Sequence, residues 1–447
     1  MRYLTYFTVF LLLAGVAPGV DAEWNRFRGP GGSGVVDDAV PITYSATQNL
    51  KWRVPLPGKG VSSPVISGDR VYLTAYTGYG LDLEEPGNPE DLVRHLLAFD
   101  RSTGQELWRL SVPSPGNEDP YKGFITQHGY ATSTPTTDGE HIYALLGKSG
   151  LFAVDRDGKE LWRRPLGQKS DNANWGDGSS PVVVDGVVVV NAGILGRHVV
   201  GLDKETGETL WSIEDAGFNN SWSTPAVAWD GGKAQVLIHF PSQVMALDPR
   251  DGKVLWSAES PIDDATSSGI VIHDQVAYLM GSRAGHGMAI ALGGSGDVSK
   301  THTRWKTNLR AGITTPVIVD GAIFWASNGI FMAHSLKDGE RIYKARLPRV
   351  GAPTGGFPNV DYSSPIVVDG HILMFTRNGE SYVIKPGETF EVVSHNAPIE
   401  GDDTAFSATP AAADGELFVR SEGFLYAFAA STDEKPPVAV AEVKEGP

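Results

Sequence analysis

Short stretches that combine aromatic, amide and charged residues are the part of this sequence whose chemistry could serve a ligand. Most of them stand a few residues ahead of a recurring Ser-Pro or Thr-Pro pair. Aromatic faces supply contact area, while amides and carboxylates orient the polar groups of a ligand. As a ring, these residues could bind a sugar, a peptide or a cation. The candidates are Gln127, His128, Tyr130, Asn174, Trp175, Asp177, Asn219, Asn220, Trp222, Asp263, Asp264, Arg310, Asp361, Tyr362, Asp402 and Asp403.

Catalytic and metal chemistry have weaker support in the sequence. His128 is the best single candidate for a catalytic role, with Asp177 as its partner, although a single loop histidine is more often a hydrogen-bonding residue. The pairs Asp263-Asp264 and Asp402-Asp403 could offer oxygen ligands to Ca²⁺, and acidic loops without a metal are the commoner alternative. Motifs of serine hydrolases, zinc proteases, phosphate-binding loops and EF-hands are missing. No catalytic residue is assigned, and a metal site stays open.

A repeat built from turn residues predicts the elements that position these candidates. A hydroxyl residue and Pro are followed by apolar residues, a turn that is mostly Asp-Gly, and more apolar residues. Asp-Gly between apolar runs predicts a tight β-hairpin, because both residues tolerate positive φ. Proline suits the first residue of a strand, where no ladder hydrogen bond is lost. The pattern occurs at Ser63-Pro64, Thr134-Pro135, Ser180-Pro181, Thr224-Pro225, Thr315-Pro316, Ser364-Pro365 and Thr409-Pro410, with a degenerate copy at Ser268-Gly269.

A second pattern follows each hairpin: a small residue, an apolar residue, Asp, a Thr-Gly or Asp-Gly turn, and Trp. It predicts a second hairpin, so each repeat holds four strands, as in a propeller blade. The last repeat lacks its fourth strand, and residues 50–54, around Trp52, resemble the missing piece. The sequence therefore predicts an all-β, eight-bladed β-propeller of four-stranded antiparallel blades, closed by its N-terminal strand. The aromatic residues expected to dock between blades are Trp52, Trp108, Trp162, Trp211, Trp256, Trp305 and Tyr343.

The spacing Ala-x-Asp-x-x-Thr-Gly-x-x-x-Trp, seen at residues 98–108, resembles the tryptophan-docking motif of the PQQ-like, or quinoprotein alcohol dehydrogenase-like, β-propeller repeat family. The resemblance covers residues 50–430. It implies an eight-bladed propeller, and the family includes both PQQ-dependent dehydrogenases and BamB-type outer-membrane assembly factors. The chain has no cysteine, whereas many of these dehydrogenases carry an adjacent cysteine pair and the assembly factor is normally a lipoprotein. Family membership alone does not decide function.

The expected strand order and the composition give further predictions about the chain. The B–C and D–A connections, including residues 77–94, should share one face, so the candidates should ring the mouth of the central channel. Residues 1–22 read as a signal peptide, 23–49 as an extended segment and 431–447 as a disordered acidic tail. A net charge of −16 disfavours nucleic acid as a partner, and no transmembrane segment is expected. The Trp24-x-x-Phe27-Arg28-Gly29-Pro30 stretch is expected to pack against the propeller.

We expect a monomeric, periplasmic or secreted module that binds an envelope protein or a carbohydrate, rather than an enzyme, with no cofactor. The alternative is a PQQ- and Ca²⁺-dependent oxidoreductase of alcohols or sugars, with its site at the channel mouth.

Overall fold

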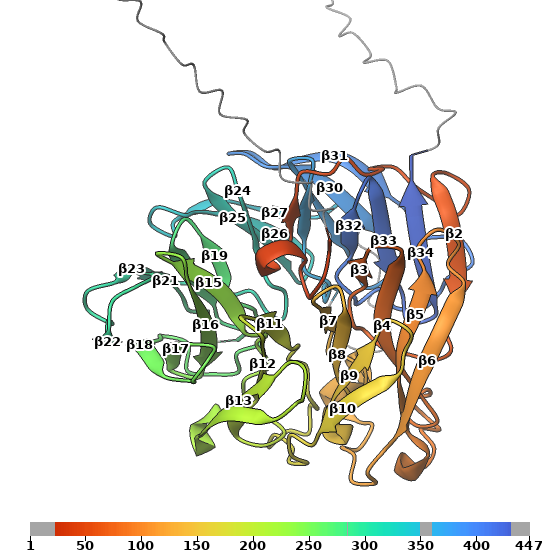
Figure 1. The fold of residues 1–447 in the computed structure, drawn as a ribbon. Helices are drawn as coiled ribbons and strands as arrows, with labels where there is room; N and C mark the ends of the chain where they lie inside the picture. Colours follow the sequence, from red (N-terminus) through yellow and green to blue (C-terminus); the bar gives the residue numbers. More distant parts are fainter. Residues whose placement is uncertain (1–22, 284, 349–359, 431–447) are drawn as a thin grey trace, which may run out of the picture.

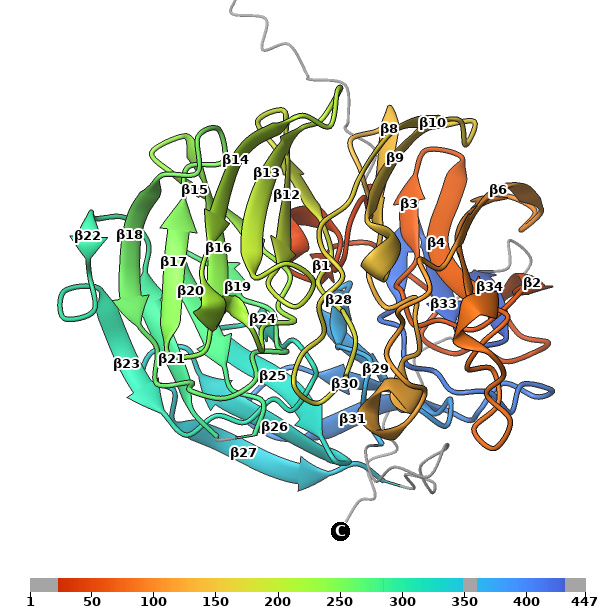
Figure 2. The same cartoon turned by 90° about the horizontal axis from the view of Figure 1, so that it is seen from below.

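Eight sheets stand in a ring about a common axis (Figures 1 and 2). The computed structural model describes residues 23–283, 285–348 and 360–430. The expected signal peptide and acidic tail lie outside this range. The described chain forms strands and short 3-10 helices, so the predicted eight-bladed, all-β propeller is confirmed.

The blades, numbered in chain order, each run from an innermost strand A to an outermost strand D, and their A strands contact one another around the ring. Blades 1 to 4 consist of β3 (Val65–Ser67), β4 (Arg70–Thr77), β5 (Val93–Asp100) and β6 (Glu106–Pro113); β7 (Thr136–Thr137), β8 (His141–Leu145), β9 (Leu151–Asp155) and β10 (Glu160–Arg164); β11 (Val182–Val184), β12 (Val187–Ala192), β13 (His198–Asp203) and β14 (Thr209–Glu214); β15 (Ala226–Asp230), β16 (Lys233–Phe240), β17 (Gln243–Leu247) and β18 (Val254–Glu259).

Blades 5 to 8 follow the same order. They consist of β19 (Val271–His273), β20 (Val276–Met280), β21 (Gly287–Ala291) and β23 (Thr303–Thr307); β24 (Val317–Val319), β25 (Ala322–Ser327), β26 (Ile330–Ser335) and β27 (Arg341–Arg346); β28 (Ile366–Val368), β29 (His371–Phe375), β30 (Ser381–Lys385) and β31 (Glu391–Asn396); β32 (Ala411–Ala413), β33 (Glu416–Arg420), β34 (Phe424–Ala429) and β2 (Leu50–Pro55). The 3-10 helices are η1 (Pro30–Gly32), η2 (Pro89–Asp91), η3 (Gly123–Gln127), η4 (Gly147–Ser149) and η5 (Ala216–Phe218).

The two ends of the propeller meet in blade 8. β2 pairs antiparallel with β34, so that Trp52 lies opposite Ala427 and Arg53 opposite Tyr426. The first strand after the N-terminal segment thus completes the sheet made by the last three. A closed ring avoids the long unpaired edges that an open array of sheets would expose.

Tryptophans on the outer strands join neighbouring blades. The indole Nε1 of Trp211 donates to the Pro249 carbonyl in the C–D turn of blade 4, at 2.8 Å. A Cβ added to Gly252 of that turn would lie 2.6 Å from the indole ring, so the ring rests on a residue without a side chain. Within its own blade, Trp211 lies opposite Gly201, where a small residue leaves room for the indole. Equivalent contacts to the next blade's turn are made by Trp52, Trp108, Trp162 and Trp305.

The two remaining docking aromatics depart from this pattern. Trp256 donates instead to the side-chain oxygen of Gln235, at 2.9 Å. The long loop before Trp305 adds a strand, β22 (Gly296–Asp297), which pairs parallel to β18 and places Gly296 opposite Trp256. Tyr343 packs against Phe331 and Phe390, and its hydroxyl has no hydrogen-bond partner among the described residues.

The interface between blades 7 and 8 has no docking tryptophan, because Ser394 occupies the equivalent register position. The N-terminal segment fills this place. Tyr44 is buried against Phe428, with ring centroids 4.6 Å apart, and its hydroxyl lies 2.6 Å from Ser381 Oγ. The backbone N–H of Tyr44 donates to Asn396 Oδ1. Further upstream, β1 (Val35–Val36) pairs parallel with β28 on the inner side of blade 7.

The docking contact can be tested from both of its sides. Trp211→Ala should lower the free energy of unfolding by about 3–5 kcal/mol, because a large buried ring is lost. Gly252→Ala should lower it by more than Gly370→Ala does, with urea denaturation as the measurement. The two glycines have φ angles of 71° and 70°, but no atom lies within 4 Å of a Cβ at Gly370. The free-energy cost of placing alanine at this positive φ is therefore similar at the two positions, about 1–2 kcal/mol. Equal losses of stability in both variants would contradict docking of Trp211 on Gly252.

Candidate functional site

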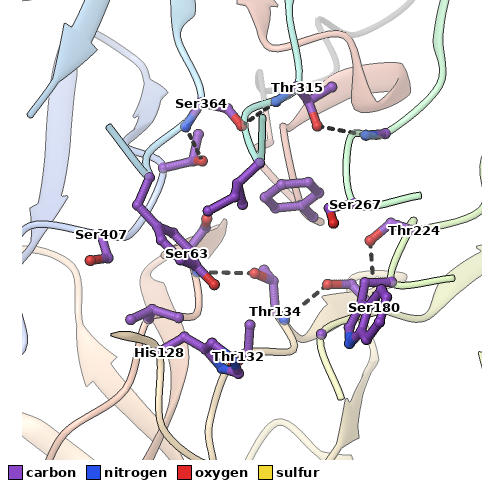
Figure 3. Close-up of a pocket in the computed structure, with 18 of the residues that line it drawn as sticks. Ser63, His128, Thr132, Thr134, Ser180, Thr224, Ser267, Thr315, Ser364 and Ser407 are labelled. Atoms are coloured by element: carbon purple, nitrogen blue, oxygen red, sulfur yellow. Dashed lines mark hydrogen bonds between the residues drawn. The ribbon is translucent and has the colours of Figure 1, made fainter. Parts of the chain in front are cut away.

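The A strands surround a cavity that opens on the face of the D–A connections (Figure 3). It contains about 800 Å³ of space not occupied by protein atoms, open solvent at its mouth included. Its walls carry hydroxyl side chains, and its mouth carries aromatic ones.

The N-terminal segment forms the floor of this cavity. Trp24 is fully buried and bridges to Ile66 of blade 1, while the Asn25 carbonyl accepts the N–H of Thr137 in blade 2. Phe27 then faces the cavity. The segment thus runs from blades 1 and 2 across the axis of the ring toward blades 6 and 7.

Arg28 anchors the far end of the floor. Its guanidinium is buried and donates to the carbonyls of Thr315, Pro316 and Pro365, at 2.6 to 3.1 Å. Burial lowers its pKa to about 9, so the group is still charged at neutral pH, and the carbonyls replace the water it has lost. The expectation that the Trp24–Pro30 stretch packs against the propeller is confirmed, and its place is the channel itself.

A belt of hydroxyls lies above the floor (Figure 3). Each belt residue precedes the proline that opens an A strand, and its backbone N–H donates to the hydroxyl of the next blade. The donors and acceptors are Ser63 to Thr134, Thr134 to Ser180, Ser180 to Thr224, Gly269 to Thr315, Thr315 to Ser364 and Ser364 to Thr409, at 2.8 to 3.1 Å. In blade 5 the belt position is Gly269, followed by Ile270. The sequence analysis placed the degenerate pair at Ser268-Gly269, so its predicted position was wrong by one residue.

Aromatic rings from four D–A connections form the mouth. The centroid of Trp175 lies 5.2 Å from that of Phe124 and 5.3 Å from that of Trp222. Tyr362 stacks over Phe124 at 6.5 Å. The indole of Trp222 is fixed by donating to the Gly176 carbonyl at 2.7 Å. These rings offer flat apolar faces to a ligand that enters the cavity.

His128 and Asp177 are the only histidine and carboxylate among the described residues that line the cavity. Burial lowers the pKa of His128 to about 4, and its Nδ1 lies 2.8 Å from Thr132 Oγ1. The imidazole is therefore neutral at physiological pH. Burial raises the pKa of Asp177 to about 7, although the N–H groups of Ser179 and Gly178 favour the ionised form. A large fraction of Asp177 is then a protonated acid that can donate a hydrogen bond.

A side bay extends from the cavity beneath Phe124 and Trp175 and reaches Arg283, Arg310 and Asp361. Of the sequence-predicted candidates, the structure brings seven to the cavity or its bay. These are His128, Trp175, Asp177, Trp222 and Tyr362 in the cavity, and Arg310 and Asp361 in the bay.

The other predicted candidates are not in the lining. Tyr130 packs in a cluster with Tyr76, Tyr79 and Tyr121 that joins the 77–94 insertion to the next connection. Gln127 is fully buried and accepts from Arg377. Asp402 accepts the hydroxyl of Tyr426 at 2.7 Å. Asp264 accepts the N–H of Arg283, and Asn174, Asn219, Asn220, Asp263 and Asp403 line neither the cavity nor its bay.

Sequence reasoning missed Phe27, Phe124, the belt hydroxyls and Arg283. The signal for the belt was present, since its residues are the hydroxyl half of the Ser-Pro and Thr-Pro repeat, which we interpreted only as a strand start. Phe124 stands just ahead of the predicted Gln127-His128 stretch. Nothing in the sequence indicated that Phe27 would reach the channel.

Comparison with known proteins places this propeller in a family. Residues 93–345, more than half of the chain, match the family described as outer membrane protein assembly factor BamB. The chain belongs to this family. BamB of Burkholderia pseudomallei is 24% identical over 44% of the chain and 42% of its own length. Tetrathionate hydrolase of Acidithiobacillus ferrooxidans is 22% identical over 76% of the chain and 67% of its own length. The chain thus spans less than half the length of this BamB relative.

Among solved structures, quinohemoprotein alcohol dehydrogenase from Comamonas testosteroni superposes with a TM-score of 0.63 at 13% identity, over 95% of this chain and 83% of its own. At this identity the likeness shows the shared fold alone.

Of the described residues that line the cavity, few could bind the quinone cofactor of such dehydrogenases. PQQ is a tricarboxylate, and a partner Ca²⁺ requires several oxygen ligands. Among the described residues, the cavity lining holds no Lys or Arg and a single carboxylate. Across the described residues, no three His, Cys, Asp or Glu side chains are grouped so as to hold a metal ion. The Asp263-Asp264 and Asp402-Asp403 pairs are included in that statement. No helix in the described part of the chain is long and apolar enough to cross a bilayer.

The raised pKa of Asp177 should appear in the stability of the protein. The folded state binds a proton at Asp177 that the unfolded state releases above a pKa of about 3.9. The stability it contributes is present at low pH and is lost as pH rises to about 7. We expect wild type to lose on the order of 1–2 kcal/mol more than Asp177→Asn between pH 5 and pH 7. Urea denaturation at both pH values measures the difference, and parallel losses would contradict a protonated Asp177.

Proposed function

We propose that this BamB-family propeller is an exported binding module whose channel cavity takes a carbohydrate. What supports the proposal is the composition of the cavity, which combines flat aromatic faces at its mouth with a belt of hydroxyls below them. Sugars present apolar ring faces and a rim of hydroxyls, so they need both kinds of surface in one site.

The shape of the cavity agrees with a module that binds and releases. The N-terminal segment lies across one end of the channel, so a ligand enters and leaves on the side of the aromatic rings. Hydrolysis by a carboxylate pair is disfavoured, because such chemistry needs two carboxyl groups on either side of the bond, and the cavity lining has Asp177 alone. His128 is neutral and bonded to Thr132, which suits positioning of the loop.

Trp175 and Trp222 should carry much of the binding energy. Removing either ring should weaken binding of the saccharide at least about 10-fold, because aromatic anchors dominate such contacts. Isothermal titration against a panel of mono- and oligosaccharides measures the effect. Trp229→Ala is the matched control, since Trp229 is 51% exposed and lines a separate hollow beside the N-terminal segment. If no saccharide binds wild type, or if all three variants lose affinity alike, the proposal fails.

A scaffold role toward an envelope protein is the second candidate, and the description of the family as an assembly factor favours it. The outer strands carry exposed aliphatic residues on several blades, among them Leu107, Leu210 and Val393, which a protein partner could cover. Capture of the same partner by wild type, together with its loss in Leu107→Asp and not in Trp175→Ala, would favour this role.

Export is part of the proposal. Cleavage after Ala22 should give a mature chain that begins with Glu23, because the preceding residues have the charged start, short apolar run and small residues of a secretory signal. Mass spectrometry of the protein recovered from the periplasm or medium reads its N-terminus. An intact Met1 in a cytoplasmic fraction would contradict export. The same preparation, run on a calibrated sizing column, tests the expected monomer.

A further inference from the structure

Two arginines reach the side bay from neighbouring connections of blade 5. The backbones of Gly281 and Arg310 bridge one another, and the N–H of Ala311 donates to the Gly281 carbonyl. Trp325 Nε1 donates to the Arg310 carbonyl at 2.8 Å. The N–H of Arg283 donates to Asp264 Oδ2 at 3.0 Å. The two arginine backbones are therefore held together by fixed contacts.

Neither guanidinium forms an ion pair with another described residue. Within the described part of the chain, no carboxylate lies within ion-pair distance of Arg283 or Arg310, whereas Arg94 pairs with Glu118 at 2.7 Å. The guanidinium carbon of Arg283 lies 4.5 Å from the centroid of the Trp175 ring. Trp175 lines both the cavity and the bay, so a ligand stacked on it would lie beside this positive charge.

Among the described residues, the carboxylates that line the cavity and the bay form no ion pair with Arg283 or Arg310. Asp361 is the one carboxylate among the described residues of the bay. It is buried, and its oxygens accept the N–H of Gly329 at 3.0 and 3.3 Å. Asp177, in the cavity, has its pKa raised to about 7 by burial, so much of it is neutral at physiological pH.

The hydroxyl belt also presents donors. The six belt hydroxyls that accept an N–H from the preceding blade donate to no other atom of the described residues. Because their acceptor sites are partly used, their O–H groups are left for a ligand's acceptor oxygens or for water. A donor-rich cavity with two unpaired arginines at its side favours negatively charged oxygens.

We propose that the ligand is an acidic saccharide, whose ring stacks on Trp175 and Trp222 and whose carboxylate or sulfate group is held by Arg283 and Arg310. This inference rests on the proposed function and narrows its ligand class. It also accounts for two exposed, unpaired arginines beside the cavity of a protein with a net charge of −16.

Matched pairs of sugars test the proposal on the full mature chain. Titration calorimetry compares a trigalacturonate with galactotriose, and galactose 6-sulfate with galactose. The acidic member of at least one pair should bind about 10-fold more tightly or better, since charge-assisted hydrogen bonds are strong. The two pairs tell a carboxylate from a sulfate ester as the preferred group.

Single substitutions test which side chains hold the negative group of the sugar. Arg283→Gln and Arg310→Gln should each weaken binding of the acidic sugar about 10-fold and weaken binding of the neutral sugar by much less. Arg304→Gln is the control, because Arg304 is exposed on β23, the outer strand of the same blade, and lines neither the cavity nor the bay. Melting curves check that all three variants fold.

The outcomes separate this inference from the proposed function. Equal affinity for acidic and neutral sugars overturns the inference and leaves carbohydrate binding standing. A loss of neutral-sugar affinity in both arginine variants, equal to the loss for the acidic sugar, also overturns it. If neither kind of sugar binds, the proposed function fails and the inference fails with it.

Discussion

The contact of an indole with a glycine in the next blade holds this ring together. A propeller blade touches only its two neighbours, so the interfaces must be satisfied one by one around the circle. Glycine meets two requirements of the turn at once. The φ of Gly252 is 71°, which other residues adopt at a cost, and the missing Cβ leaves room for the ring of Trp211. Each such interface therefore needs two residues of the repeat, a tryptophan on one blade and a glycine on the next.

The N-terminal segment becomes necessary where that pair is missing. At the junction of blades 7 and 8, Ser394 takes the register position of the tryptophan, and Tyr44 packs into the space instead. The same segment supplies Phe27 to the cavity floor, β1 to blade 7 and then leads to β2 in blade 8. One continuous stretch of chain thus completes the fold and lies across one end of the channel. The cavity is therefore lined at one end by the segment that leads into the strand closing the ring.

The sequence allowed the fold to be predicted because its signals are local. Asp-Gly turns and the Trp spacing act over a few residues and repeat, so the blades could be counted without tertiary information. The site was predicted in part. Topology placed the D–A connections at the channel mouth, and Trp175, Asp177 and Trp222 line the cavity as expected.

What sequence could not supply was the direction of each side chain. Tyr130 stands two residues from His128 but turns away into a tyrosine cluster, because the 77–94 insertion provides apolar partners there. Asp402 has the composition of a loop ligand but accepts a buried tyrosine hydroxyl. The channel position of Phe27 depends on hydrogen bonds from Arg28 to carbonyls 287 and 337 residues away, in blades 6 and 7. Contacts of this range are set by closure of the ring and leave no periodic trace in the chain.

The residues that line the cavity, rather than the fold, decide which ligands it can take. A shared ring of eight sheets fixes where a site can be, since the A strands converge on one axis, but the connections decide its chemistry. Among the described residues, the cavity lining holds no Lys or Arg, and Arg283 and Arg310 stand to one side, past Trp175. A ligand that places its ring in the cavity and its charge in the bay would use both parts. Charge and apolar surface thus lie side by side rather than one above the other along the axis, and the proposal of an acidic, ring-shaped ligand rests on this arrangement.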